Sequence, residues 1–363
     1  MPSLFDPIAI GPLALKNRIW MAPLTRGRAT KEAVPTPLMA QYYAQRAEAG
    51  LIISEATGIS REGLGWPFAP GLWTDAQVEG WKPVTQAVHA SGGRMVAQLW
   101  HMGRLVHPDL GGGQPLSSSA TTAPHHAHTY EGNKPYVAAR AATRKDIARI
   151  VGDYARAAVN AIRAGFDGIQ VHGANGYLVD QFLRASANSR DDDYGGSIDK
   201  RLRFMTEVLE AIGAEIGVDR VGIRYSPNIL SQGVDDPEPL ALYTAVAKRL
   251  EQLGVPWIEL REPGPDSTFG SGATEPVSQA MRAHYSGVIA LNSDYLGDTA
   301  QGRIDEGVAD AIAFGRTFLA NPDLVERIRI GADLNEPDGK TFYTQGPEGY
   351  VDYPALDGER AAA

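Results

Sequence analysis

Eight short apolar segments of strand type recur along this chain, and most of them are followed by a stretch with a helical pattern. Parallel strands need such crossover connections, because each helix returns the chain to the same edge of the sheet. Eight units favour an α/β fold of the (β/α)8 TIM-barrel type over an open doubly wound sheet, which usually has fewer strands and a reversal in strand order. The expected strands are residues 19–24, 51–56, 95–100, 168–172, 221–225, 257–260, 288–292 and 311–316.

The helical stretches between these segments carry start signals and apolar faces. Thr143, with Asp146 three residues later, has the pattern of a capping box and predicts a helix over residues 143–164. Residues 197–216 place apolar side chains at steps of three and four, from Ile198 to Ile216, which predicts a second amphipathic helix.

Two connections are longer than is usual in such folds: residues 101–142 after the third strand and residues 177–196 after the fourth. Long loops on the C-terminal rim of a barrel commonly act as lids over a site. Residues 1–17 precede the first strand, and we expect them to cap the bottom of the barrel. The whole chain, residues 1–363, is expected to form a single domain.

The composition argues against several classes of function. A formal net charge of −9 without a long run of Lys or Arg argues against nucleic acid or an anionic membrane surface as a partner. The chain has no cysteine, which excludes disulfides, thiolate nucleophiles and cysteine-held metal clusters. No run of about 18 apolar residues occurs, and the first residues lack the features of a signal peptide, so we expect a cytoplasmic protein.

Polar residues stand near the C-terminal ends of several expected strands. They are Thr25, Gln98, His172, Arg224 and Arg316. The C-terminal rim of a barrel is where the active site lies, so we expect these side chains to gather around one site.

The segment after the fourth strand carries an imidazole, a carboxamide and a phenol within six positions: His172, Asn175 and Tyr177. Gly173 and Gly176 permit a tight turn there. One helical turn would let His172 and Asn175 point the same way, as two neutral hydrogen-bond donors aimed at one acceptor. The pattern favours a clamp for a carbonyl or nitro oxygen, although a satisfied His and Asn at a strand end would look the same.

The ends of the seventh and eighth units predict a phosphate site. Loops seven and eight of a barrel commonly bind phosphate through backbone N–H groups and a cation. Here Ser293 follows the seventh strand, and Gly315 and Arg316 end the eighth unit. Gly315 would allow the backbone to approach a phosphate, and Arg316 would pair with it in a bidentate manner.

A histidine-rich tract lies in the long loop after the third strand. His125, His126 and His128, together with His107, could hold a metal, but no acidic residues accompany them in a ligand pattern. We therefore expect solvated or pocket-rim histidines and no metal site.

A set of short phrases, spread over nearly the whole chain, carries a family resemblance. They are LFDP at residues 4–7, KNR at 16–18, MAPLTR at 21–26, SEATG at 54–58, AQLWHMG at 97–103, GFDG at 165–168, VHGANGY at 171–177, DYGGS at 193–197, FGR at 314–316, NPDL at 321–324 and GYVDYP at 349–354. In this order and spacing the chain resembles the old yellow enzymes, the FMN-dependent ene-reductase family, close to its bacterial N-ethylmaleimide and nitroester reductase branch.

The resemblance implies tightly bound, non-covalent FMN over the C-terminal mouth of the barrel. The residues that match the cofactor-binding positions of the family are Ala22, Pro23, Thr25, Ala56, Gln98, Arg224, Ser293, Gly315 and Arg316. Of these, Arg224 would lie near the flavin N1 and O2 atoms, where the reduced ring carries negative charge, and the last three would hold the phosphate.

The resemblance also implies a reaction. NADPH or NADH would reduce the flavin, and an enone, enal, maleimide or nitroalkene would then take the hydride at the same site, in ping-pong order. His172 and Asn175 would bind the activating oxygen, and Tyr177 would donate the proton. Thr25, Trp66, Trp100 and Tyr343 match substrate-pocket positions.

Some alternatives remain open from the sequence. Nitroester or nitroaromatic reduction on the same scaffold is less favoured, because Asn175 stands where some nitroester reductases have His. Another FMN barrel dehydrogenase or oxidase would be expected to have a different base arrangement. A cofactor-free aldolase would need a lysine at a strand end, which the eight segments lack. We expect a monomer or a weak homodimer.

Overall fold

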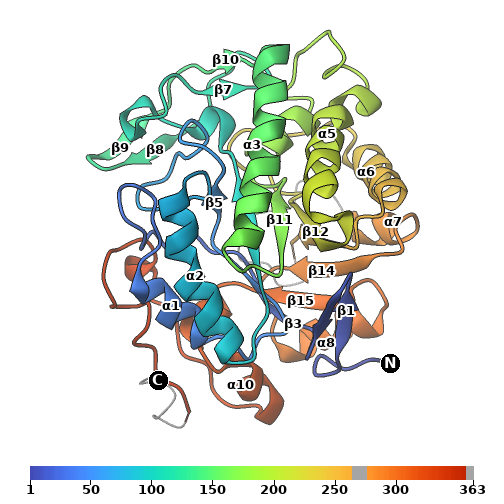
Figure 1. Cartoon of the computed structure of the whole chain (residues 1–363). Coiled ribbons are helices and arrows are strands. Elements are labelled where there is room, and N and C mark those ends of the chain that lie inside the picture. The colour runs from blue at the N-terminus through green and yellow to red at the C-terminus, as the bar shows by residue number, and fades with distance from the viewer. Residues whose placement is uncertain (264–275, 357–363) are drawn as a thin grey trace.

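The structure is a computed structural model that describes residues 1–263 and 276–356. Within these residues, eight parallel strands form a closed ring, because the last strand pairs with the first (Figure 1). In order around the ring, the strands are β3 (Ile19–Met21), β4 (Ile52–Ile53), β6 (Met95–Trp100), β11 (Gly168–His172), β12 (Val221–Tyr225), β13 (Trp257–Arg261), β14 (Val288–Asn292) and β15 (Ala311–Phe314). The (β/α)8 barrel expected from the sequence is confirmed.

Some strand ends differ from the prediction. Strands β6, β11, β12 and β14 have the predicted bounds, whereas β3 stops short of Pro23, which has no N–H to offer a neighbouring strand. Strand β4 also ends early, and the Glu55 N–H donates to the Tyr43 hydroxyl at 2.8 Å. Strand β15 ends at Phe314 because Arg316 is the first residue of a helix, and β13 runs one residue further than predicted, to Arg261.

Helices cover the outside of the ring, and α3 and α5 lie side by side there (Figure 1). In chain order they are α1 (Pro37–Ala44), α2 (Asp75–Ala90), α3 (Arg144–Arg163), α4 (Leu178–Leu183), α5 (Ile198–Ile216), α6 (Pro239–Leu253), α7 (Ser278–Arg282), α8 (Gly297–Asp305), α9 (Arg316–Ala320) and α10 (Leu324–Ile330). The predicted capping box is confirmed: Thr143 Oγ1 accepts from the Asp146 N–H at 3.1 Å, and Asp146 Oδ2 accepts from the Thr143 N–H at 2.9 Å. Among the described residues, no helix combines the length and apolar character needed to cross a bilayer.

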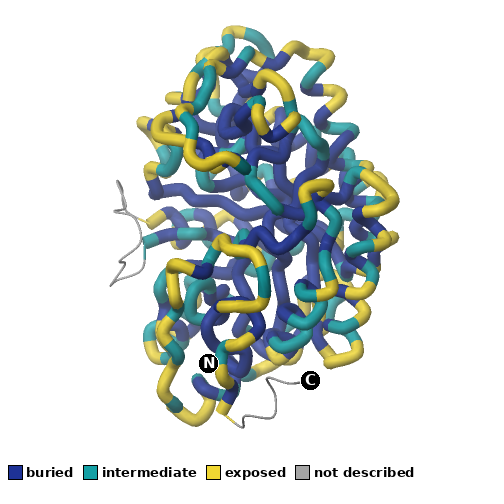
Figure 2. Tube along the Cα trace, turned by 90° about the vertical axis from the view of Figure 1, so that its left-hand side faces the viewer, coloured by how far each residue is buried: buried dark blue, intermediate teal, exposed yellow. Residues whose placement is uncertain are grey.

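The inside of the barrel changes from apolar to polar along the strands. Near the strand starts, Trp20, Val96, Trp257 and Ala311 belong to one buried apolar cluster, in which the two indole rings meet edge to face at 5.5 Å. Further along, the inward positions carry amides and charged groups. The apolar end stabilises the barrel, and the polar end is left for a site. The barrel strands consist almost entirely of buried residues, and Figure 2 shows a buried centre with exposed segments around the outside.

A small antiparallel hairpin closes the apolar end of the barrel, as expected for the N-terminal segment. It consists of β1 (Ile8–Ile10) and β2 (Leu13–Leu15), and Ile10 and Leu15 join the apolar cluster inside the barrel. Gly11 at its tip has φ +51°, and a Cβ there would lie 1.9 Å from the Asp219 carbonyl oxygen. Only glycine allows the tip to approach the turn before β12 this closely.

The two long connections contain regular elements. The one after β6 holds η1 (Gly103–Leu105), η2 (Pro108–Leu110), β7 (Leu116–Ser117), the hairpin of β8 (His126–Thr129) and β9 (Gly132–Pro135), and β10 (Arg140–Ala141), while α4 lies in the one after β11. The buried Arg104 donates to the carbonyl oxygens of Gln232 and Gly233, at 2.9 and 3.0 Å, and so joins the loop after β6 to the loop after β12.

Candidate active site

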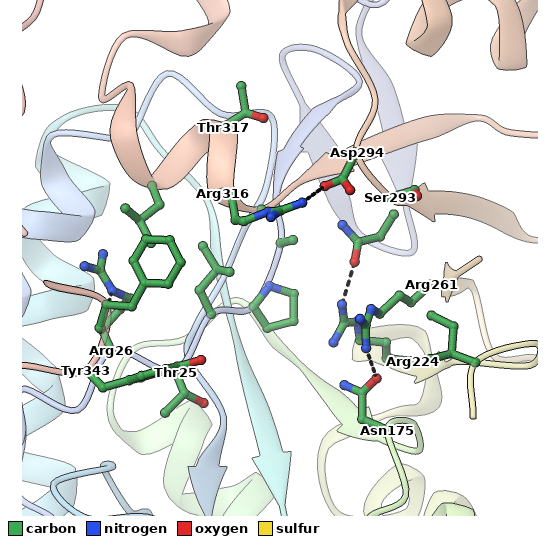
Figure 3. Close-up of a pocket in the computed structure, with 18 of the residues that line it drawn as sticks. Thr25, Arg26, Asn175, Arg224, Arg261, Ser293, Asp294, Arg316, Thr317 and Tyr343 are labelled. Atoms are coloured by element: carbon green, nitrogen blue, oxygen red, sulfur yellow. Dashed lines mark hydrogen bonds and ion pairs between the residues drawn. The ribbon is translucent and has the colours of Figure 1, made fainter. Parts of the chain in front are cut away.

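A cavity of about 270 Å³ opens at the C-terminal mouth of the barrel, where the ends of β3, β12, β13, β14 and β15 meet (Figure 3). Most of the residues expected to bind cofactor or substrate line it: Ala22, Pro23, Thr25, Trp66, Asn175, Tyr177, Arg224, Ser293, Gly315, Arg316 and Tyr343. These residues are distant in the chain, and the barrel brings them together because all its strands end at one rim.

The other expected residues, Ala56, Gln98, Trp100 and His172, are buried beside the cavity. The Tyr177 ring lies 4.7 Å from the His172 ring and 5.0 Å from the Trp100 ring, edge on to both. Ala56 belongs to the same apolar cluster as Trp100. This packing fixes the orientation of the phenol and the imidazole relative to each other.

A buried chain of hydrogen bonds crosses the barrel just inside the rim. Gln98 Nε2 donates to Gln170 Oε1 at 2.7 Å, and Gln170 Nε2 donates to Glu259 Oε2 at 2.7 Å. Arg224 Nε donates to Glu259 Oε1 at 2.9 Å, and Arg224 Nη2 donates to Asn292 Oδ1 at 2.6 Å. The network holds the guanidinium of Arg224 in one place, with a carboxylate to balance its charge.

The turn after His172 is left-handed, unlike the helical turn considered from the sequence. The Tyr177 N–H donates to the Ala174 carbonyl oxygen at 3.2 Å, and Asn175 and Gly176 between them have φ of 58° and 78°. Two consecutive positive φ angles are typical of a type I′ turn, for which Asn-Gly is the preferred sequence. The dipeptide itself was therefore a signal for this geometry.

His172 is a neutral hydrogen-bond donor. Burial lowers the pKa of its imidazole well below the ordinary value, and the charges of Arg224 and Arg261 lower it further. Its Nδ1 accepts from the Ala174 N–H at 3.3 Å. Since a neutral imidazole carries one proton, that proton is on Nε2.

Asn175 is held by two neighbouring strands. Its backbone N–H donates to Ser226 Oγ, just after β12, at 2.8 Å, and its side-chain Oδ1 accepts from Arg261 Nη1, at the end of β13, at 2.6 Å. Burial, followed by the nearby Arg224 charge, lowers the pKa of Arg261 to about 10, so Arg261 still carries its positive charge at neutral pH.

Tyr177 keeps its proton at neutral pH. Burial raises the pKa of the phenol above its ordinary value, the nearby Tyr136 and Tyr343 raise it further, and Arg261 and Arg224 oppose the rise. A protonated phenol at the edge of a cavity can serve as a proton donor.

Arg316 lines the same cavity as Asn175 but lies away from it, beside Asp294 (Figure 3). It is the first residue of α9, and its Nη2 lies 2.6 Å from Asp294 Oδ1. Neighbouring protein atoms do not require glycine at position 315, because a Cβ there would meet only Leu24, at an ordinary 3.6 Å.

The donor set of this cavity fits FMN. A guanidinium at one end suits a phosphate, a second one, on Arg224, suits the electron-rich edge of a reduced flavin, and the small side chains of Ala22 and Pro23 line the cavity with them.

The rim of the cavity is aromatic. The Trp66 ring lies 5.0 Å from the Tyr343 ring and 4.4 Å from the His128 ring, which belongs to the β8–β9 hairpin. His125 and His126 are exposed. His128 is exposed too, and its ring contacts Trp66, which lines the cavity. His107 is buried instead, and its Nδ1 accepts from the Asp109 N–H at 3.2 Å, so the expectation of a solvated or pocket-rim side chain is wrong for this histidine. In the described part of the chain, no three His, Asp or Glu side chains group closely enough to hold a metal ion.

Sequence reasoning assigned no role to Gln170, Glu259 or Arg261. A sequence signal for two of them was present. Trp257, Glu259 and Arg261 are two residues apart along one strand and therefore face the same side of the sheet. The predicted strand ended at Leu260, so its last inward residue was overlooked. Asp294 was also missed, because its pairing with Arg316 depends on how two loops fold.

Comparison with known proteins agrees with this fold. Residues 3–335 match the family described as NADH:flavin oxidoreductase / NADH oxidase. The chain is 40% identical over 373 residues to 12-oxophytodienoate reductase 7 of Oryza sativa subsp. japonica, which covers 97% of this chain and 94% of that protein.

Solved structures resemble it closely as well. The old yellow enzyme homologue from Zymomonas mobilis matches with a TM-score of 0.96 at 53% identity, covering 98% of this chain and 100% of that one. Morphinone reductase in complex with tetrahydroNAD matches with a TM-score of 0.93 at 46% identity, covering 99% of each chain. This chain therefore belongs to the NADH:flavin oxidoreductase / NADH oxidase family, among the old yellow enzymes, and is an FMN oxidoreductase.

Proposed function

We propose that this protein is an NAD(P)H-dependent ene-reductase, which reduces C=C bonds activated by a carbonyl or nitro group. One observation carries the proposal: a neutral imidazole donor on His172, a fixed amide on Asn175 and a protonated phenol on Tyr177 gather at one edge of the cavity. Such a set suits a reaction in which negative charge grows on an oxygen and a proton is needed nearby.

FMN, bound along Ala22, Pro23, Thr25, Ala56, Gln98, Arg224, Ser293, Gly315 and Arg316, would supply the hydride and be reduced again by NADPH or NADH. The solved complex of morphinone reductase with tetrahydroNAD supports a nicotinamide dinucleotide as the reductant. The family match spans residues 3–335, which leaves little of this chain for a separate nucleotide-binding domain. The reductant and the alkene would therefore use one site in turn.

The residues of this chain act on the alkene through its activating oxygen. His172 Nε2–H and the Asn175 amide N–H group donate to that oxygen, and their hydrogen bonds strengthen as hydride addition to the β-carbon turns it into an enolate oxygen. Tyr177 then gives its proton to the α-carbon, so that one hydride and one proton are added across the double bond. Trp66, Trp100, Thr25 and Tyr343 would bound the substrate.

The test begins with the visible spectrum of the purified protein, followed by anaerobic reduction with NADPH and, separately, NADH. Reoxidation is then measured with 2-cyclohexenone, N-ethylmaleimide and a nitroaromatic compound. We expect a flavin spectrum, bleaching by the reductant and rapid reoxidation by the two activated alkenes. A colourless protein that does not bind added FMN, or reduced protein that the alkenes do not reoxidise, would contradict the proposal. Faster reoxidation by the nitroaromatic compound would favour the nitroreductase alternative.

A further inference from the structure

Arg261 and Asn175 meet at the edge of the cavity although they come from strands that are not neighbours. Arg261 ends β13, Asn175 follows β11, and β12 lies between these two strands. Arg261 Nη1 donates to Asn175 Oδ1 at 2.6 Å, and both residues line the cavity (Figure 3). This hydrogen bond is short and charge-assisted, because its donor is a guanidinium.

This contact decides which end of the amide faces a ligand. A carboxamide has an accepting oxygen and a donating NH2 group, and rotation by half a turn exchanges them. A guanidinium can only donate, so the end beside Arg261 has to be Oδ1. The NH2 group is then the end that remains for a substrate. Without the hydrogen bond from Arg261, the amide could rotate and turn Oδ1 toward the ligand, where it would repel a carbonyl oxygen.

The charge on Arg261 strengthens this effect. At neutral pH the guanidinium stays protonated, because burial and the neighbouring Arg224 lower its pKa only to about 10. A cation hydrogen-bonded to Oδ1 polarises the amide and makes its N–H bonds better donors.

The backbone of Asn175 is held separately from its side chain. Its N–H donates to Ser226 Oγ at 2.8 Å, and the turn is closed by the Tyr177 N–H, which donates to the Ala174 carbonyl oxygen at 3.2 Å. Neither hydrogen bond involves Arg261. A change at Arg261 can therefore free the amide without removing the bonds that shape the turn.

We propose that Arg261 is a positioning residue: by occupying Oδ1 of Asn175, it turns the amide N–H group toward the activating oxygen of the substrate. The inference rests on the proposed function, since it assigns the orientation of one half of the oxygen clamp. Asn175 is the residue that touches the substrate, and Arg261 acts through it.

A double-mutant cycle tests this directly. Arg261→Met, Asn175→Ala and the double variant are compared with the wild-type FMN-loaded protein for binding of 4-chlorophenol, followed by the absorbance of the flavin. The phenolate oxygen accepts hydrogen bonds as an enolate oxygen does, so this ligand reports on the clamp without turnover. Arg261→Lys keeps a positive donor and is the conservative control.

We expect Arg261→Met to weaken 4-chlorophenol binding about tenfold when Asn175 is present. In the Asn175→Ala background the same change should have an effect of less than about twofold, because the residue through which Arg261 acts is gone. Arg261→Lys should restore part of the affinity. All variants should retain the flavin spectrum.

Equal losses in both backgrounds would overturn the inference, because Arg261 would then act on the ligand directly. No loss in either background would overturn it too. If the wild-type protein binds the phenol but is not reoxidised by 2-cyclohexenone, the proposed function is wrong while the cycle still decides the role of Arg261. A wild-type holoprotein that does not bind the phenol would count against both.

Discussion

Arg224 and Glu259 form an ion pair inside the barrel, with Arg224 Nε donating to Glu259 Oε1 at 2.9 Å. The Glu259 side chain is fully buried, and that of Arg224 is nearly so. A buried guanidinium is costly without a counter-charge, and Glu259 supplies that counter-charge to Arg224 at the polar end of the barrel. The strength of the positive field at the cavity therefore depends on a residue that does not line it.

Substituting Glu259→Gln should have two effects. The free energy of unfolding should fall by about 3 kcal/mol, because Arg224 loses its counter-charge. The reduction potential of bound FMN should rise, because an unbalanced cation stabilises the negatively charged reduced flavin. Urea unfolding measures the first effect and a spectroelectrochemical titration the second.

Asp180→Asn is the matched control for that prediction. It breaks another buried ion pair, in which Arg184 Nε lies 3.1 Å from Asp180 Oδ1, and neither residue lines the cavity. We expect a comparable loss of stability with an unchanged potential. Should both variants leave the potential where it is in the wild type, Arg224 does not lie against the flavin as proposed.

Tyr177→Phe should separate the two half-reactions. Loss of the proton donor should slow reoxidation by 2-cyclohexenone about 100-fold, since general acids contribute on that order. Reduction by NADPH needs no proton from Tyr177 and should stay within about twofold. Stopped-flow measurement of each half-reaction gives both rates.

Tyr136→Phe serves as the control phenol. Tyr136 packs against the same apolar cluster as Tyr177, and burial raises the pKa of its hydroxyl to about 12. Its substitution should change neither rate appreciably. Equal slowing of both half-reactions in Tyr177→Phe would contradict its role as the proton donor.

Much of the fold could be predicted because its signals are local. The strands were visible as short apolar runs, and the start of α3 was visible in Thr143 and Asp146, which are three residues apart. The C-terminal segment was not predictable in this way. It is held by Arg26, whose Nη2 donates to the Gly349 carbonyl oxygen at 2.7 Å across a separation of 323 residues. No local pattern encodes a side chain that binds backbone so far away.

The candidate site could also be predicted only where its signals are local in the sequence. His172, Asn175 and Tyr177 could be named from one short segment, and the cavity brings Asn175 and Tyr177 to one edge beside His172. What orients them could not be named, because Arg261 and Ser226 approach Asn175 from other strands. Their contribution depends on the register of three adjacent strands rather than on any spacing in the sequence.

His172→Ala should weaken binding of 4-chlorophenol about tenfold, because the variant loses the Nε2–H donor of the clamp. His172→Asn, which offers an amide N–H group near the same place, should lose less. Titrations of the flavin absorbance at one pH compare the three proteins. If the alanine variant binds the phenol as well as the wild type does, the imidazole is not part of the clamp.

Glu55 should make the stability of the protein depend on pH between about pH 5 and 8. Its buried Oε2 accepts from the Arg26 and Gly27 N–H groups, both at 3.2 Å, while Oε1 is buried without a hydrogen-bond partner among the described residues. Burial raises the pKa of this carboxyl from 4.5 to about 7, and the two N–H donors and the charges of Arg26 and Arg28 only partly oppose the rise.

The sign of the effect follows from the direction of that shift. Between pH 4.5 and 7 the folded protein holds the Glu55 proton and the unfolded chain has lost it, so this residue makes the free energy of unfolding fall as the pH rises. Between about pH 5 and 8, the proton on Glu55 should account for on the order of 2–3 kcal/mol of the fall in the free energy of unfolding. In Glu55→Gln the side chain at this position cannot ionise, so this part of the pH dependence of the free energy of unfolding should be absent. Urea unfolding of both FMN-loaded proteins across that range gives the difference between their free energies of unfolding. As the pH rises, this difference should shift in favour of the variant, because only the wild type loses the contribution of Glu55. A difference that stays constant from pH 5 to 8 would show that Glu55 ionises in the folded protein as it does in the unfolded chain.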